Sequence, residues 1–187
     1  MSLSSLLTYV GYVLHRIPWE HWVAMAVVSL VVAMWFGVRK KCPLYGAIAL
    51  GCAMMMGLVL LDAAVVNRLG VQVERHPEFN FRAEIQRLFH GSEQHRIQIV
   101  SNVAVFIPFG FFVSEFLSVA KRTNARRCLG IAILCGFLLS LSMEVMQRIF
   151  RVGLFELTDM AMNVVGSSIG ALSSLCLRRL VVCQKDV

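Results

Sequence analysis

Charged residues are scarce in this sequence. Only 16% of the 187 residues are Asp, Glu, Lys or Arg, whereas soluble domains usually contain about 25%. Hydrophobic residues make up 58% of the chain, and the polar ones stand in short clusters between long apolar runs. A soluble core needs runs of only about 10–14 residues, and a membrane span needs about 20. The composition therefore excludes a soluble globular domain and predicts a polytopic membrane protein.

Several familiar signals are missing as well. The formal charge of +7 is not accompanied by a nucleic-acid motif, and most basic residues flank the apolar runs, so nucleic acid is not an expected partner. The opening stretch "MSLSSLLTYVGYVLHR" lacks the basic start of a cleaved signal peptide. No internal repeat supports a transporter built on inverted repeats. The cysteines show no zinc-binding spacing, so we expect neither a metal nor a cofactor.

The apolar runs predict an all-α fold, a bundle of about five transmembrane helices. Their pattern does not alternate, and only helices and closed barrels satisfy the backbone in lipid. The expected spans are residues 22–38, 44–66, 99–120, 128–147 and 158–177. Residues 1–187 would form a single membrane domain.

Two further helices are expected outside the spans. Residues 3–14 are too short to cross the bilayer upright, which predicts an interfacial or re-entrant helix. The loop 67–97 carries Phe81, Ile85 and Phe89 at helical spacing. This spacing predicts an amphipathic helix that lies in the outer membrane interface.

The short loops indicate the orientation of the bundle. Basic residues follow the first, third and fifth spans, and all four lysines lie on that side. The opposite side has five arginines in the loop 67–97, where four glutamates dilute them. Because cytoplasmic loops are enriched in Lys and Arg, we expect the C-terminus in the cytoplasm of a bacterial cell and the N-terminus outside.

Polar residues occur in four of the expected spans at a similar depth, near the outer ends. An ionised group at the bilayer centre costs ~2.5–3.5 kcal/mol on insertion scales, so such side chains should face the bundle interior. Asp62 is one of these residues, close to the end of the second span. The residues expected to form an outward-facing pocket are Asn102, Ser140, Glu144, Gln147, Arg148, Asp159 and Asn163.

Small residues share the faces of these polar groups. Gly136 lies on the face of Glu144, and Gly166 and Gly170 follow Asn163 on its face. Small residues let membrane helices approach closely, so we expect the fourth and fifth spans to pack on these faces. This packing would bring Glu144 near Asn163, and Asp159 near an arginine of the preceding loop, Arg148.

Plain structural roles remain open for the same residues. The glycines can serve packing alone, and Asp159 can stabilise the start of a helix. The two asparagines can bridge helices through hydrogen bonds. Glu144 can pair with Arg148 or Arg151, while Glu115 can reach the basic loop that follows its span.

Three blocks, in this order and spacing, resemble the VanZ-like family. They are "NVAVFIPFG" at residues 102–110, "SLSMEVMQ" at 140–147 and "TDMAMNVVGSSIG" at 158–170. The resemblance places a family core at residues 98–177 and implies a small multi-pass membrane protein. It also implies a link to glycopeptide resistance, since the family is named for a protein that confers low-level teicoplanin resistance.

The family's signature positions map onto this chain one by one. They are Asn102, Pro108, Gly110, Ser140, Glu144, Gln147, Asp159, Asn163 and Gly166. Pro108 removes a backbone donor, which predicts a kink that opens space between the third, fourth and fifth spans. The chain departs from many relatives before Asp159, because its arginine stands early, at Arg151.

Three functions are compatible with these patterns. The first is an outward-facing pocket for an amphiphilic envelope component, such as a membrane lipid, a lipid-linked precursor or a lipoglycopeptide. The second is a membrane enzyme in which Glu144 and Asp159 form an acid/base pair, although Ser140 has no histidine beside it. The third is a structural or assembly subunit, in which the polar cluster only registers the helices.

Overall fold

The computed structural model describes residues 3–69, 92–120, 123–153 and 156–183, and within these ranges the chain forms helices and no strand. The elements are α1 (Leu3–His15), α2 (Trp19–Arg39), α3 (Leu44–Ala64), the short 3₁₀ helix η1 (Val66–Arg68), α5 (Glu93–Ala120), α6 (Ala125–Phe150) and α7 (Leu157–Cys183). Five of these described helices, α2, α3, α5, α6 and α7, are long and apolar enough to cross a membrane. The predicted all-α multi-pass bundle is thus confirmed. The amphipathic stripe expected at residues 81–89 lies outside the described residues.

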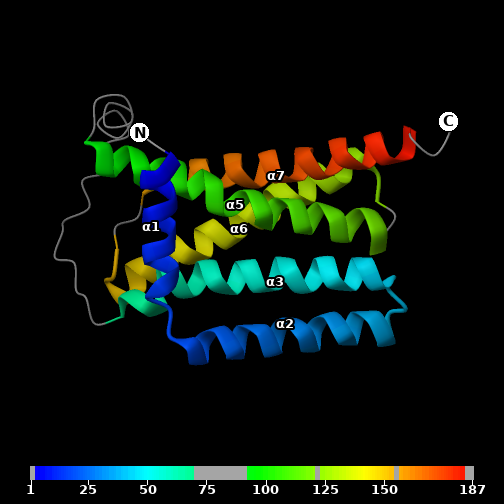
Figure 1. Ribbon diagram of the computed structural model, residues 1–187, viewed down its shortest axis with the longest axis horizontal. Coiled ribbons are helices and arrows are strands. Elements are labelled where there is room, and N and C mark those ends of the chain that lie inside the picture. The colour runs from blue at the N-terminus through cyan, green and yellow to red at the C-terminus, as the bar shows by residue number, and fades with distance from the viewer. Residues whose placement is uncertain (1–2, 70–91, 121–122, 154–155, 184–187) are drawn as a thin grey trace.

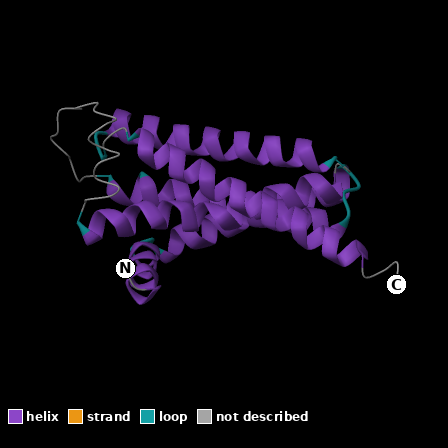
Figure 2. Cartoon of the chain, turned by 90° about the horizontal axis from the view of Figure 1, so that it is seen from above, coloured by secondary structure: helices purple, strands orange, loops and turns teal. Residues whose placement is uncertain are grey.

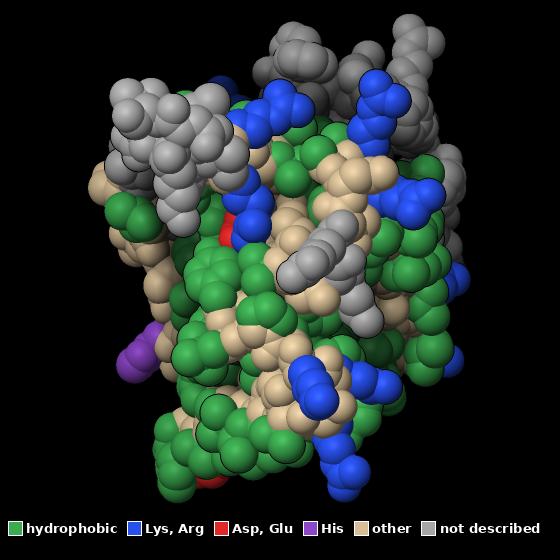
Figure 3. Space-filling view, turned by 90° about the vertical axis from the view of Figure 1, so that its right-hand side faces the viewer, with side chains coloured by type: hydrophobic (Ala, Val, Ile, Leu, Met, Phe, Trp, Pro, Cys, Tyr) green, Lys and Arg blue, Asp and Glu red, His purple; other side chains and the backbone are tan. Residues whose placement is uncertain are grey.

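The five long helices run side by side along the longest axis of the molecule, and consecutive ones point in opposite directions (Figure 1). The helix α1 crosses one end of this bundle at a steep angle and is seen nearly end-on from above (Figure 2). We call this end the α1 end. Lys and Arg side chains gather at the opposite end, the basic end, as Figure 3 shows.

The closest approach in the bundle is between α5 and α7. A Cβ atom added at Gly166 would overlap the carbonyl oxygen of Val103, and one added at Gly170 would overlap that of Ile107. A Cβ at Gly110 would likewise overlap the backbone of Ser167. The prediction that the glycines of the last span pack against the fourth span is wrong. They pack against α5, because the glycine face of α7 lies on the backbone of α5.

The contact of α6 with α7 uses a different set of small residues. A Cβ at Gly136 of α6 would overlap the side chain of Ser167. One turn further along α6, Ser140 accepts a hydrogen bond from Asn163 Nδ2 at 2.8 Å. The helix α7 therefore contacts α5 and α6 through neighbouring faces, and the hydrogen-bond partner of Asn163 on α6 is Ser140, whereas Glu144 was the expected neighbour.

At the α1 end, α2 is joined to α3 by a polar pair. His21 Nδ1 lies 2.6 Å from Asp62 Oδ1, and Asp62 is buried. Nearby, Ile17 and Met25 pack on Val59 of α3. Asp62 thus stabilises the start of α2, a role that its position in an apolar run could not identify.

An ion pair joins α5 to α7 near the basic end. Arg178 donates two hydrogen bonds to Glu115, from Nε to Oε1 at 3.0 Å and from Nη2 to Oε2 at 2.5 Å. Ser174 also donates to Glu115 Oε1, at 2.7 Å. Glu115 is only 2% exposed. The basic loop was one possible partner of Glu115, and its cation comes instead from α7.

Candidate functional site

Glu144 is buried at the α1 end of α6, with an exposed fraction of 4%. Its Oε2 atom accepts a hydrogen bond from the backbone N–H of Glu156 at 2.9 Å. Glu156 directly precedes α7, so the carboxyl group of Glu144 on α6 holds the start of α7 in position. An oxygen of the carboxyl group can accept this hydrogen bond whether or not the group is ionised.

Gln147 occupies the next turn of α6 and binds a third helix. Its Nε2 atom donates to the carbonyl oxygen of Ala64, at the end of α3, at 3.0 Å. Arg151 then ends α6 in the left-handed conformation, with φ at 55°. Its N–H bonds the carbonyls of Arg148 and Gln147, and the N–H of Val152 also bonds Gln147. Arg151 is therefore a helix terminator in this chain, and its side chain is exposed.

The charged groups around Glu144 differ from those expected. Arg68, Asp159 and Glu156 lie within electrostatic reach of its carboxylate, whereas Arg148 is exposed on the surface of α6. In the described part of the chain, ion pairs join His21 to Asp62 and Arg178 to Glu115. A cation that acts on Glu144 thus comes from η1. Sequence spacing could not reveal this, because η1 and α6 are far apart in the chain.

Four polar residues of α6 and α7 are satisfied within the protein. Glu144, Gln147, Ser140 and Asn163 are all buried and hydrogen-bonded to other segments of the chain. They form a closed cluster that holds the end of α3, the end of α6 and the start of α7 together. Among the described residues, no three metal-binding side chains come together.

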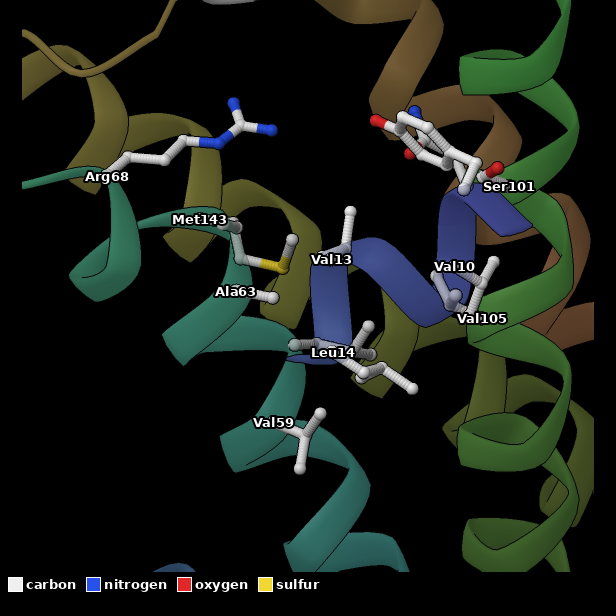
Figure 4. Close-up of a pocket in the computed structure, with 13 residues that line it drawn as sticks. Val10, Val13, Leu14, Val59, Ala63, Arg68, Ser101, Val105 and Met143 are labelled. Carbon is white, nitrogen blue, oxygen red and sulfur yellow. The ribbon is translucent and has the colours of Figure 1, made fainter. Parts of the chain in front are cut away.

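A cavity of about 110 Å³ lies beside this cluster, beneath α1. Val10, Val13 and Leu14 of α1 face the bundle there, as Figure 4 shows. The other walls come from α3, α5 and α6, through Val59, Leu60, Ala63, Ala64, Val105 and Met143. The polar groups that line the cavity are those of Tyr9, Arg68, Ser101 and Asn102.

The cavity differs in position from the expected pocket. The expected pocket lies between the third, fourth and fifth spans, which are α5, α6 and α7. Seven residues were expected to form it. Of these, Asn102 lines the cavity, whose remaining boundary includes α1 and α3 but not α7. Pro108 lies inside α5 and is not among the residues that line the cavity, so the opening expected at the proline stays a prediction.

Asn102 is the expected pocket residue that also lines the observed cavity. Its Nδ2 atom is buried and has no hydrogen-bond partner within the described residues. An unsatisfied buried donor costs about 1–3 kcal/mol, so a group that accepts its hydrogen bond would be stabilising. Ser101, beside it, donates to the carbonyl of Ile97 at 2.7 Å and keeps acceptor capacity.

The hydrogen bond of Glu144 predicts different effects for two substitutions. Glu144→Gln should retain most of the stability, because the amide oxygen still accepts the N–H of Glu156. Glu144→Leu should lower the free energy of unfolding by about 1–3 kcal/mol, since it leaves that N–H without its acceptor. Thermal unfolding of the two purified variants in one detergent measures the difference. Equal melting temperatures would contradict the structural role of this carboxylate.

Comparison with known proteins identifies the family of this chain. No curated protein and no solved structure matches the chain. Residues 47–178 match the family model described as VanZ/LLP1. The match includes α3 almost entirely, α5, α6 and most of α7, and so contains both the closed polar cluster and most walls of the cavity. Because it covers more than half of the sequence, the chain belongs to the VanZ/LLP1 family.

Proposed function

We propose that this protein binds an amphiphilic component of the bacterial cell envelope in the cavity beneath α1. The observation that carries the proposal is the composition of the cavity wall. Apolar side chains from four helices surround a space that also receives the unpartnered Nδ2 of Asn102 and the guanidinium of Arg68. Ligand sites are commonly apolar spaces with a few convergent polar groups that orient the ligand.

The proposed orientation puts the α1 end outside the cell and the basic end in the cytoplasm. It is supported by the side chains at the basic end, where Arg39, Lys40, Arg126 and Arg179 are exposed. Short cytoplasmic loops carry such an excess of Lys and Arg. The cavity would then open toward the outer leaflet, where envelope amphiphiles and lipoglycopeptides such as teicoplanin are encountered.

A structural role is the second candidate, and the closed cluster favours it for Glu144, Gln147 and Asn163. These side chains bond other segments of the protein and leave the cavity to other residues. Buried polar groups can register helices in this way. In this reading the cluster holds the cavity walls in place, and the two roles are complementary.

Filling the cavity tests the binding function. Val13→Trp places an indole among the cavity walls, and Leu7→Trp puts the same side chain on an exposed position of α1 as a matched control. Binding of radiolabelled single-chain lipids with anionic, zwitterionic and uncharged heads is measured in detergent. We expect Val13→Trp to weaken their binding by about tenfold or more, which is ~1.4 kcal/mol, and Leu7→Trp to bind as the parent protein does. Unchanged binding by Val13→Trp would contradict the proposal.

A further inference from the structure

We infer that the cavity beneath α1 selects a lipid with a negatively charged phosphate head and takes in only one narrow hydrocarbon chain. This inference rests on the proposed function and names the ligand class of that site. It follows from the character of the polar groups, from the size of the space and from the surrounding charges.

The polar groups at the cavity are mainly hydrogen-bond donors. Arg68 supplies a guanidinium, Asn102 the unpartnered Nδ2 and Tyr9 a phenolic hydroxyl. The lining includes neither Asp nor Glu. Figure 4 shows Arg68 extending from η1 toward α1. A guanidinium binds phosphate oxygens with two parallel hydrogen bonds, so an anionic phosphate is the head group that these donors fit.

The size of the cavity limits what can enter it. Pockets that enclose a drug-sized ligand measure about 300–1,000 Å³, whereas this space is about 110 Å³. The core of a glycopeptide therefore stays outside, and so does a two-chain lipid as a whole. The aliphatic walls of Val10, Val13, Val59 and Val105 instead fit the first part of a single chain below its head group.

The position of Arg68 decides where the head group lies. The residue is exposed at the end of η1, and among the described residues it has no ion pair. It does act electrostatically on Glu144, whose carboxylate is committed to the N–H of Glu156. Glu144 is buried whereas Arg68 is exposed, so this acidic residue lies on the bundle side of Arg68. A phosphate would approach from the outer side, with its chain directed beneath α1.

The test compares two lipids that share one acyl chain. Palmitoyl lysophosphatidic acid carries an anionic phosphate, and palmitoyl lysophosphatidylcholine is zwitterionic. Native mass spectrometry of the full-length protein in detergent measures the affinity for each. We expect the parent protein to prefer the anionic lipid by about tenfold, as expected for a charge-assisted hydrogen bond. Farnesyl phosphate, as a third probe, distinguishes an isoprenyl chain from an acyl chain.

Variants separate this inference from the proposed function. Arg68→Gln should reduce the preference to within about twofold, while Arg68→Lys should retain part of it because the charge remains. Arg148→Gln, an exposed arginine at the same end of the bundle, is the matched control and should keep the full preference. If the parent protein bound both lipids with equal affinity, and Val13→Trp weakened the binding of both, the head-group inference alone would be overturned. Binding that Val13→Trp does not affect would overturn the proposed function.

Discussion

Gly170→Leu should prevent the bundle from folding, whereas Gly130→Leu should leave it intact. A Cβ at position 170 would overlap the carbonyl oxygen of Ile107 and the backbone nitrogen of Phe111 on α5. Both are backbone atoms, so a rotamer change cannot relieve the overlap, and α7 would have to separate from α5. Overpacking of a well-packed core costs about 1–3 kcal/mol and occasionally more. Because a leucine also extends beyond Cβ, we expect the upper end of this range or a complete loss of folded protein.

Gly130 provides the control in the same kind of helix. No heavy atom lies within 4 Å of a Cβ built there, and leucine favours a helix over glycine by about 0.5–1 kcal/mol. The yield of monodisperse protein after detergent extraction and its melting temperature measure both variants. If Gly170→Leu were extracted and melted like the parent, the close contact of α5 with α7 would be refuted.

The second large effect concerns the ion pair of Glu115 with Arg178. Removing one partner of a buried pair costs about 3–5 kcal/mol, because the other charge stays behind without compensation. The side chain of Glu115 is 3% exposed and that of Arg178 is 32% exposed. Arg178→Met should therefore destabilise more than Glu115→Gln does, since an unpaired Arg178 can turn to water and an unpaired Glu115 cannot. Chemical unfolding of each variant in mixed micelles measures the order.

Glu115→Leu, Arg178→Met and their double variant form a double-mutant cycle. Glu115→Leu combined with Arg178→Met removes both charges, and a hydrophobic replacement of a buried pair is often neutral or stabilising. We expect the double variant to be more stable than Arg178→Met alone. Additive losses in the two single changes would show that the pair does not couple α5 to α7.

The sequence predicted the spans well and their contacts only in part. Hydropathy alone determines where a helix of about 20 apolar residues can lie, and the observed helices contain nearly all of the residues expected in spans. The shared depth of Asn102, Glu144 and Asn163 also followed from the lengths of the spans, because depth depends only on position along a helix.

The partners of these residues could not be predicted in the same way. A stripe of small residues indicates that a helix approaches closely, but it does not say which helix does so. Gly166 and Gly170 could thus be assigned to α6 as easily as to α5. The position of α1 above the cavity and the reach of Arg68 depend on tertiary packing between segments that are distant in the chain, which no local pattern encodes.

The polar face of α7 has a consequence for how the protein is made. This helix is the least hydrophobic of the five described spans, and polar side chains within a span need partners inside the bundle. Its polar side chains are matched by groups on earlier helices, Ser140 of α6 for Asn163 and Glu115 of α5 for Arg178. During synthesis those helices leave the ribosome first. The helix α7 therefore meets its partners as it inserts, whereas a circular permutant that begins with α7 would insert Asn163 before Ser140 of α6 is present to accept its hydrogen bond.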